Sequence, residues 1–159
     1  MKFDKESFIA ANALVDLEPV FASLIVNAQH LPKDYGRLQM QTLILLSDVG
    51  ALTITEIAEH HLVSKQHMSQ IIPHMEEHGL VFKFQKENNK KNIYVDITDK
   101  GKKTIEDYVV ATSETISRML ECMDTIEKEE ITLCCRKLKN LLSKADNKSN
   151  MLKNSKAYE

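Results

Sequence analysis

Apolar side chains recur at alternating steps of three and four residues in three long stretches of this sequence. The first stretch carries Leu14, Leu17, Phe21, Leu24, Ala28 and Leu31. The second carries Ile105, Val109, Thr112, Ile116, Met119 and Met123, and the third carries Ile131, Cys135, Leu138 and Leu142. Such spacing places side chains on one face of a helix. The pattern predicts long helices over about residues 7–34 and 104–145.

The middle of the chain has a different pattern, with short elements and clear start signals. Thr53-Ile54-Thr55-Glu56 has the form of a capping box, in which a hydroxyl and a carboxylate each accept from a backbone N–H at a helix start. Ser64 can cap a second helix, which carries Met68, Ile71, Ile72 and Met75 at helical spacing. Gly79 predicts its end. We expect a kink at Pro73 in this helix, and a kink or break at Pro19 in the first long helix.

Two β-rich runs follow Gly79, at Leu80–Gln85 and Ile93–Ile97, with the polar segment Lys86–Lys91 between them. This arrangement predicts a hairpin with a lysine-rich tip. Two short helices followed by a hairpin are the order of a winged helix-turn-helix, which we place at about residues 37–103. The predicted fold class is mainly α (α+β): a winged helix-turn-helix with long N- and C-terminal dimerisation helices.

The long terminal helices present more apolar surface than the small middle of the chain can cover. We therefore expect them to pack against a second copy, which makes the protein a homodimer. The side chains expected at this interface are Leu14, Leu17, Phe21, Ile116, Met119, Leu138 and Leu142. An intramolecular helical core is the alternative.

Composition predicts one soluble domain over residues 1–159, because a chain that is 43% hydrophobic and has only 4 glycines and 3 prolines can build a core of its own. Asn, Lys and Ser dominate residues 146–159, which we expect to form a flexible tail. No apolar run is expected to reach membrane-spanning length, and the N-terminus lacks the apolar segment of a signal peptide. A cytoplasmic protein without a membrane partner is predicted.

Charge is distributed unevenly along the chain. The formal net charge is −2, but residues 81–103 carry seven lysines against three acidic residues, a local balance of +4. A wing that contacts phosphates would have this asymmetry, since only the face toward DNA must be positive. A solvated hairpin with ordinary surface lysines is the alternative.

The middle region resembles the multiple-antibiotic-resistance regulator (MarR) family of winged helix-turn-helix proteins. The family's leucine-threonine start, Gly-Leu-Val exit into the wing and Leu-Thr-x-x-Gly restart correspond to Leu52-Thr53, Gly79-Leu80-Val81 and Ile97-Thr98-Asp99-Lys100-Gly101. The order and length of the helices extend the resemblance over nearly all of residues 7–145. The wing departs from the family pattern, since Asn89, Lys91 and Lys83 stand where an Asp-x-Arg pair and an arginine are usual.

The resemblance implies a transcription regulator, more specifically a repressor, that binds double-stranded DNA as a homodimer. Two recognition helices related by a two-fold axis would enter successive major grooves of a pseudo-palindromic operator, and the wings would reach the flanking backbone or minor groove. The resemblance also implies that a small aromatic or phenolic ligand binds between the dimer helices and the DNA-binding lobe. No cofactor is expected.

Candidate DNA contacts fall on the second helix of the pair and on the wing. The candidate base-reading residues are Lys65, Gln66, His67, Ser69 and Gln70. The candidate backbone and wing contacts are Ser64, Lys83, Lys86, Asn89, Lys90 and Lys91. No arginine stands between Arg37 and Arg118, whereas Gln66 and Gln70 can pair bidentately with adenine, which favours an A·T-rich operator. A general bias of composition against arginine is the alternative explanation.

Other chemistry has weaker support in the sequence. His74 and His78 stand four residues apart, but no third ligand has matching spacing, so structural or solvent-exposed histidines are favoured over a metal site. Cys122, Cys134 and Cys135 are expected to be buried and inert, with oxidant sensing as the alternative. The sequence has no Gly-rich phosphate loop and no nucleophile–base pair, so an enzyme is not expected. A winged-helix module that binds proteins and has lost DNA binding is the alternative function.

Overall fold

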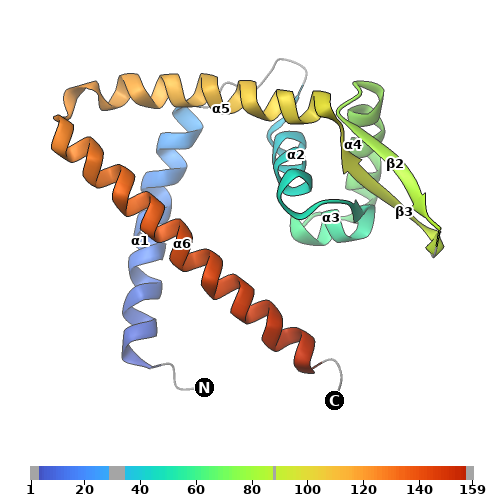
Figure 1. Ribbon diagram of the computed structural model, residues 1–159, viewed down its shortest axis with the longest axis horizontal. Helices are drawn as coiled ribbons and strands as arrows, with labels where there is room; N and C mark the ends of the chain where they lie inside the picture. The colour runs from blue at the N-terminus through green and yellow to red at the C-terminus, as the bar shows by residue number, and fades with distance from the viewer. Residues whose placement is uncertain (1–3, 29–34, 88, 157–159) are drawn as a thin grey trace. The chain divides into compact units, whose positions relative to one another are not determined.

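The computed structural model describes residues 4–28, 35–87 and 89–156, without the side chains of residues 89–91 and 146–156. The chain divides into two compact units, residues 1–116 and 117–159. The elements in chain order are α1 (Lys5–Ala28), α2 (Arg37–Val49), β1 (Leu52–Thr53), α3 (Ile54–His60), α4 (Lys65–Glu77), β2 (Val81–Lys86), β3 (Asn89–Ile97), α5 (Asp99–Met119), a 3-10 turn (Leu120–Cys122) and α6 (Thr125–Lys156) (Figure 1). The mainly helical fold with a winged helix-turn-helix is confirmed. The single domain remains a prediction.

The helix α1 is continuous and apolar over most of its length. It runs through Pro19, so the alternative of a break there is wrong. Proline has no N–H, so the carbonyl of Val15, four residues before Pro19, has no helical donor. Val15 lies on an exposed stretch, where water can bond to this carbonyl. The helix has a mean hydropathy of 1.7 over its most apolar window and is long enough to cross a membrane by length and composition. The expectation that no apolar run reaches that length was wrong. Apolar side chains outside the predicted seam, such as Phe8 and Val20, also raise the mean hydropathy of the helix.

The core of the first unit lies under the helix α4. Met68, Ile72 and Met75 of this helix have no exposed surface. They belong to one hydrophobic cluster with Leu43 and Leu46 of α2, Ile57 of α3, and Leu80, Val81 and Val95 of the hairpin. Burial of each large aliphatic side chain contributes about 1.5–3 kcal/mol to folding. The predicted apolar stripe of α4 is therefore the face that attaches the helix to the rest of the unit.

Both helices of the helix-turn-helix begin at the predicted caps. The Thr53 N–H donates to Glu56 Oε2 over 2.7 Å, and the Glu56 N–H donates to Thr53 Oγ1 over 3.3 Å. The Thr53 N–H and the Thr53 hydroxyl both donate to the Glu56 carboxylate, and they lower its pKa because they favour its charged form. At the start of α4, the His67 N–H donates to Ser64 Oγ over 3.1 Å. The capping box and the Ser64 cap are confirmed.

The end of α4 is confirmed at Gly79, which has a φ of 69°. A glycine adopts this left-handed conformation without steric cost. The chain then turns back, since the Gly79 N–H donates to the Glu76 carbonyl over 2.8 Å and the Leu80 N–H donates to the Met75 carbonyl over 2.9 Å. The helix is continuous through Pro73. The kink at Pro73 remains a prediction.

The hairpin is longer than the sequence pattern suggests. Strands β2 and β3 pair antiparallel from Val81↔Ile97 to Gln85↔Ile93, and after a bulge Lys86 pairs with Asn89. The short strand β1 pairs with the other edge of β3, which gives the order β1-β3-β2. The segment Lys86–Lys91 was expected to be a loop, yet Lys86 lies in β2 and residues 89–91 lie in β3. Cross-strand backbone pairing overrides the weak β propensity of lysine and asparagine here.

A close contact joins the first turn of α5 to the base of the hairpin. Thr98 Oγ1 donates to the Gly79 carbonyl over 2.6 Å and accepts from the Gly101 N–H over 3.0 Å. A Cβ atom at Gly101 would lie against the Leu80 carbonyl oxygen and 2.6 Å from Ile97 Cγ1. The glycine of the Ile97–Gly101 motif is therefore required by space.

The second unit is formed by the end of α5, the 3-10 turn and α6. The helix α6 continues into the predicted tail, to Lys156, because this segment contains no glycine or proline that would end it. None of the side chains of residues 125–145 is buried, and Cys122, Cys134 and Cys135 are all exposed. The expected burial of these thiols is therefore wrong for a single chain, because no element of the described unit covers them.

Replacing Gly101 with serine should lower the free energy of unfolding by about 1–3 kcal/mol or more, because the new Cβ must displace backbone. Gly36→Ser is the matched control, since a Cβ there would lie 3.7 Å from its nearest neighbour and serine suits an N-cap position. Denaturant unfolding measures both changes. Equal effects of the two substitutions would contradict the close contact at Gly101.

Stability should fall as the pH drops below about 6.5, the ordinary value for histidine. Burial, and to a smaller extent the charge of His60, lowers the pKa of His61. The His61 Nε2 lies 3.3 Å from Oγ1 of the buried Thr42. The unfolded chain therefore binds a proton at His61 before the folded chain does, and folding loses free energy through that range. Unfolding measured from pH 7.5 to 5.5 tests this prediction.

The variant His61→Gln should have a shallower pH dependence than the wild type, because glutamine does not titrate. His67→Gln removes an exposed histidine instead and is the matched control. If the stability of His61→Gln depended on pH as steeply as that of the wild type, His61 would not link protonation to folding.

Candidate nucleic-acid interface

The exposed face of α4 carries all the candidate base-reading residues. Met68 and Ile72 are buried on one side of the helix, and the 3.6-residue period turns Gln66 and Gln70 to the opposite side. The structure places Lys65, Gln66, His67, Ser69 and Gln70 at exposed positions of the first turns. This surface can therefore contact a ligand without any rearrangement of the core.

The polar groups of this face are available for new bonds. Within the described part of the chain, the side chains of Lys65, Gln66 and Gln70 make no hydrogen bond or ion pair. The Ser64 hydroxyl, in contrast, is used as the helix cap. A glutamine amide carries both donors and an acceptor, which suits it to read a base edge.

Most of the seven lysines in residues 81–103 have partners inside the chain. Lys83 Nζ lies 2.6 Å from Glu76 Oε2, which joins β2 to α4. Lys100 Nζ donates to the His78 carbonyl over 2.7 Å, at the end of α4. On α5, Lys102 pairs with Asp99 and Lys103 pairs with Asp107. The local balance of +4 therefore overstates the charge that the wing can present to a ligand.

The α5 ion pairs lie on an exposed helix surface. The bond to Asp107, together with the nearby Glu106, raises the pKa of Lys103. Its side chain is two-thirds exposed, so solvent screens the interaction and its contribution to stability is small.

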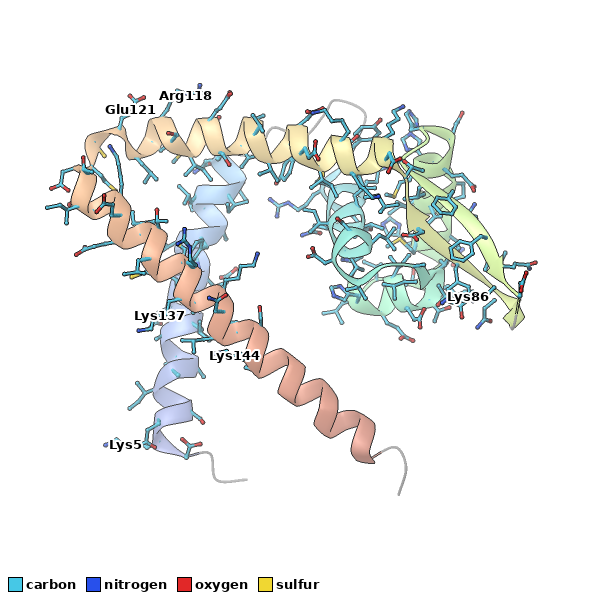
Figure 2. All side chains as sticks on the ribbon, in the orientation of Figure 1. Lys5, Lys86, Arg118, Glu121, Lys137 and Lys144 are labelled. Carbon is cyan, nitrogen blue, oxygen red and sulfur yellow. The ribbon has the colours of Figure 1, made fainter. Side chains whose placement is uncertain are left out.

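The wing carries an aromatic surface that the sequence analysis did not single out. Phe84 lies 5.7 Å from Phe82 and 5.9 Å from Tyr94, measured between ring centroids. Lys86 Nζ lies 4.0 Å from the centre of the Tyr94 ring, a cation–π contact near the end of the hairpin (Figure 2). Alternation of side chains along β2 could have revealed this surface, since every second residue from Phe82 to Lys86 shares one face.

The predicted wing contacts differ in what the structure says of them. Lys86 is exposed, whereas Lys83 is engaged by Glu76. Asn89, Lys90 and Lys91 belong to β3, and their side chains lie outside the described residues.

Histidines connect the C-terminal half of α4 to the start of α2. Gln39 Oε1 accepts from the Gly36 N–H, so the Gln39 amide nitrogen faces His74 Nδ1 at 3.0 Å. The His74 and His78 rings lie 4.2 Å apart, and Tyr35 meets the His78 ring edge-on. The part of the chain that the structure describes contains no group of three or more His, Cys, Asp or Glu side chains that could hold a metal ion.

Comparison with known proteins identifies this region. The model of the MarR family matches residues 37–93, from the start of α2 into β3. This match assigns residues 37–93 to the MarR family. A curated relative in Bacillus subtilis, the uncharacterized HTH-type transcriptional regulator YfiV, is 26% identical over 98 residues, which are 62% of this chain and 61% of the relative. The chain thus aligns with about three fifths of that relative's length.

Solved structures share the MarR-like fold. The transcriptional regulator Tm0710 from Thermotoga maritima has a TM-score of 0.70 at 15% identity, covering 84% of this chain and 96% of that one. The PcaV transcriptional regulator from Streptomyces coelicolor, solved in complex with its natural ligand, has a TM-score of 0.51 at 13% identity, covering 88% and 98%. Identities this low show the fold alone. The family and these neighbours are transcription regulators rather than enzymes.

Replacing Gln66 or Gln70 with alanine should weaken binding to the preferred operator by about 1–3 kcal/mol, because a base contact is lost. Binding to random DNA should change much less. Gln41→Ala removes an exposed glutamine from α2 and is the matched control, expected to bind as the wild type does. Titration of labelled duplexes measures the affinities. Equal losses on both DNAs would assign these side chains to the DNA backbone instead.

Proposed function

We propose that this protein is a sequence-specific DNA-binding repressor of the MarR family, which acts as a homodimer on a pseudo-palindromic operator. The observation that carries the proposal is the exposed polar face of α4, which has no side-chain partner at Lys65, Gln66 or Gln70 among the described residues. The buried stripe of Met68, Ile72 and Met75 holds this face in place. A rigid helix with free donors and acceptors on its outer face is what major-groove reading requires. Gln66 and Gln70 favour adenine, so we propose an operator rich in A·T pairs.

The wing would add affinity through the DNA backbone or the minor groove. Lys86 supports this role because it is exposed near the end of the hairpin. Asn89, Lys90 and Lys91 follow in β3, and we propose that they contact phosphates. We leave Lys83 out of this set, because its ammonium group already neutralises Glu76.

A second copy of the chain would cover the apolar surface of the terminal helices. Phe8 is 60% exposed in α1 and Leu133 is 64% exposed in α6. Long helices that expose many large apolar side chains are unusual on a surface that stays in contact with water. The charge of Asp16 disfavours a membrane as the cover for α1, because a carboxylate near the centre of a membrane span costs about 2.5–3.5 kcal/mol. We therefore propose a cytoplasmic homodimer.

A small aromatic or phenolic ligand would release the operator. The ligand-bound state of PcaV supports this part of the proposal, since that regulator shares the fold and was solved with its natural ligand. A ligand that binds the dimer more tightly in a form unable to span two major grooves would shift the population away from DNA.

The direct test is a gel-shift and footprint titration on the DNA upstream of the protein's own gene, at physiological salt. A shuffled duplex of the same composition is the control. The proposal expects preferential binding to one site, with two protected half-sites whose centres lie about 10 base pairs apart. Equal affinity for the native and shuffled duplexes would contradict sequence-specific binding and would favour a protein-interaction module.

The interface prediction is tested by replacing Leu138 and Leu142 together with lysine. The double variant should sediment as a monomer where the wild type is a dimer, because two charges would be buried in the seam at a cost of several kcal/mol. Asn140→Lys with Ser143→Lys adds the same charge to another face of α6 and should leave the dimer intact. A monomeric wild type at micromolar concentration would contradict the proposed homodimer.

A further inference from the structure

A surface groove lies where the helix-turn-helix meets the wing. Its volume is about 460 Å³, and its lining residues are Thr53, Ile54, Thr55, Lys65, Asn92 and Ile93. Thr53 ends β1 and caps α3, and the other lining residues come from the start of α3, the first turn of α4 and the middle of β3. Thr55 and Asn92 were not among the candidate contacts found in the sequence, because the groove forms only when the three elements pack together.

The groove combines one cation, three neutral polar residues and an apolar surface, and the hydroxyl of one of the three, Thr53, is already used by Glu56. Lys65, Thr55 and Asn92 are exposed and make no side-chain hydrogen bond or ion pair within the described residues. Ile93 is 48% exposed and supplies apolar surface beside them. A lysine suits a phosphate, hydroxyl and amide groups suit its remaining oxygens, and an apolar side chain suits a sugar ring.

The neighbouring acidic group does not reverse the charge of the groove. Glu56 Oε2 accepts from both the N–H and the hydroxyl of Thr53, at 2.7 and 2.8 Å. The attraction of Lys86 for this carboxylate also contributes to its lowered pKa. The Glu56 charge is thus held by groups of the protein, whereas the Lys65 ammonium group has no partner among the residues that the structure describes.

We propose that this groove holds one sugar–phosphate unit of the operator backbone, with Lys65, Thr55 and Asn92 as its polar contacts. The proposal rests on the proposed function. If α4 enters a major groove and the wing reaches the adjacent minor groove, a single DNA strand must pass between them, and the groove lies between the start of α4 and β3. The positions of α4 and β3 are sufficient to place the DNA strand in this groove.

This assignment changes the role of Lys65 and adds two residues to the interface. Lys65 contacts a phosphate, so base reading begins one residue later, at Gln66. A phosphate contact carries no sequence information, but it fixes how far α4 enters the major groove and in which register. Asn92 connects the wing to that same phosphate, so the wing and the recognition helix are aligned by one point of the backbone.

The test compares Lys65→Met, Asn92→Leu and the control Lys102→Met, which removes an exposed lysine of α5 outside the groove. Asn92→Leu should weaken binding about 2- to 10-fold on both operator and shuffled DNA, because a neutral hydrogen bond is lost. Lys65→Met should also weaken both alike and should flatten the dependence of log affinity on log salt by up to about 1.8 units for a dimer. The control should keep the wild-type affinity and slope, and thermal unfolding should show that all three variants fold.

A scan with neutral methylphosphonate substitutions identifies the phosphate itself. One position in each half-site should weaken wild-type binding and have no further effect on Lys65→Met, because the contact is already lost. A wild type that binds operator DNA while Lys65→Met and Asn92→Leu bind equally well would overturn the groove assignment and leave the proposed function standing. If Lys65→Met lost affinity for the operator but not for shuffled DNA, the groove assignment would also be overturned, because Lys65 would then contact a base. A wild type that binds no DNA would overturn both.

Discussion

Met68, Ile72 and Met75 have no exposed surface, and this burial fixes the rotation of α4 about its own axis. The rest of the proposed interface depends on that constraint. Truncation of one such side chain to alanine typically costs about 2–5 kcal/mol, so a rolled helix would lose far more than any single DNA contact can return. The polar face that includes Gln66 and Gln70 is therefore already exposed in the free protein, and the proposed base contacts would require little reorganisation.

The position of α4 along the chain is fixed by its two ends. Ser64 caps the start, and Gly79 turns the chain back toward the hairpin, where Thr98 and Gly101 close the base. The wing therefore leaves α4 at a defined point. Because Lys83 and Glu76 join β2 to α4 as well, the groove between the recognition helix and the wing has walls of defined geometry.

Local signals in the sequence predicted the parts of this structure that depend on neighbouring residues. The capping box at Thr53, the Ser64 cap and the Gly79 stop each involve groups a few residues apart, and all three were predicted. The extent of the hairpin was not predicted, because strand pairing at Lys86 depends on the partner strand rather than on propensity. For the same reason the ion pair of Lys83 with Glu76 and the groove at Asn92 could not be read from the sequence, since each joins elements through tertiary packing.

The outer face of α4 is the surface that we propose lies against operator bases. Site-specific photocrosslinking tests it most directly, with a benzophenone side chain introduced at Gln70 and, as the matched position on α2, at Gln41. We expect position 70 to crosslink to bases inside each half-site and position 41 not to crosslink to bases. A specific protein–DNA complex in which Gln70 forms no crosslink to bases, while Gln41 does, would contradict it.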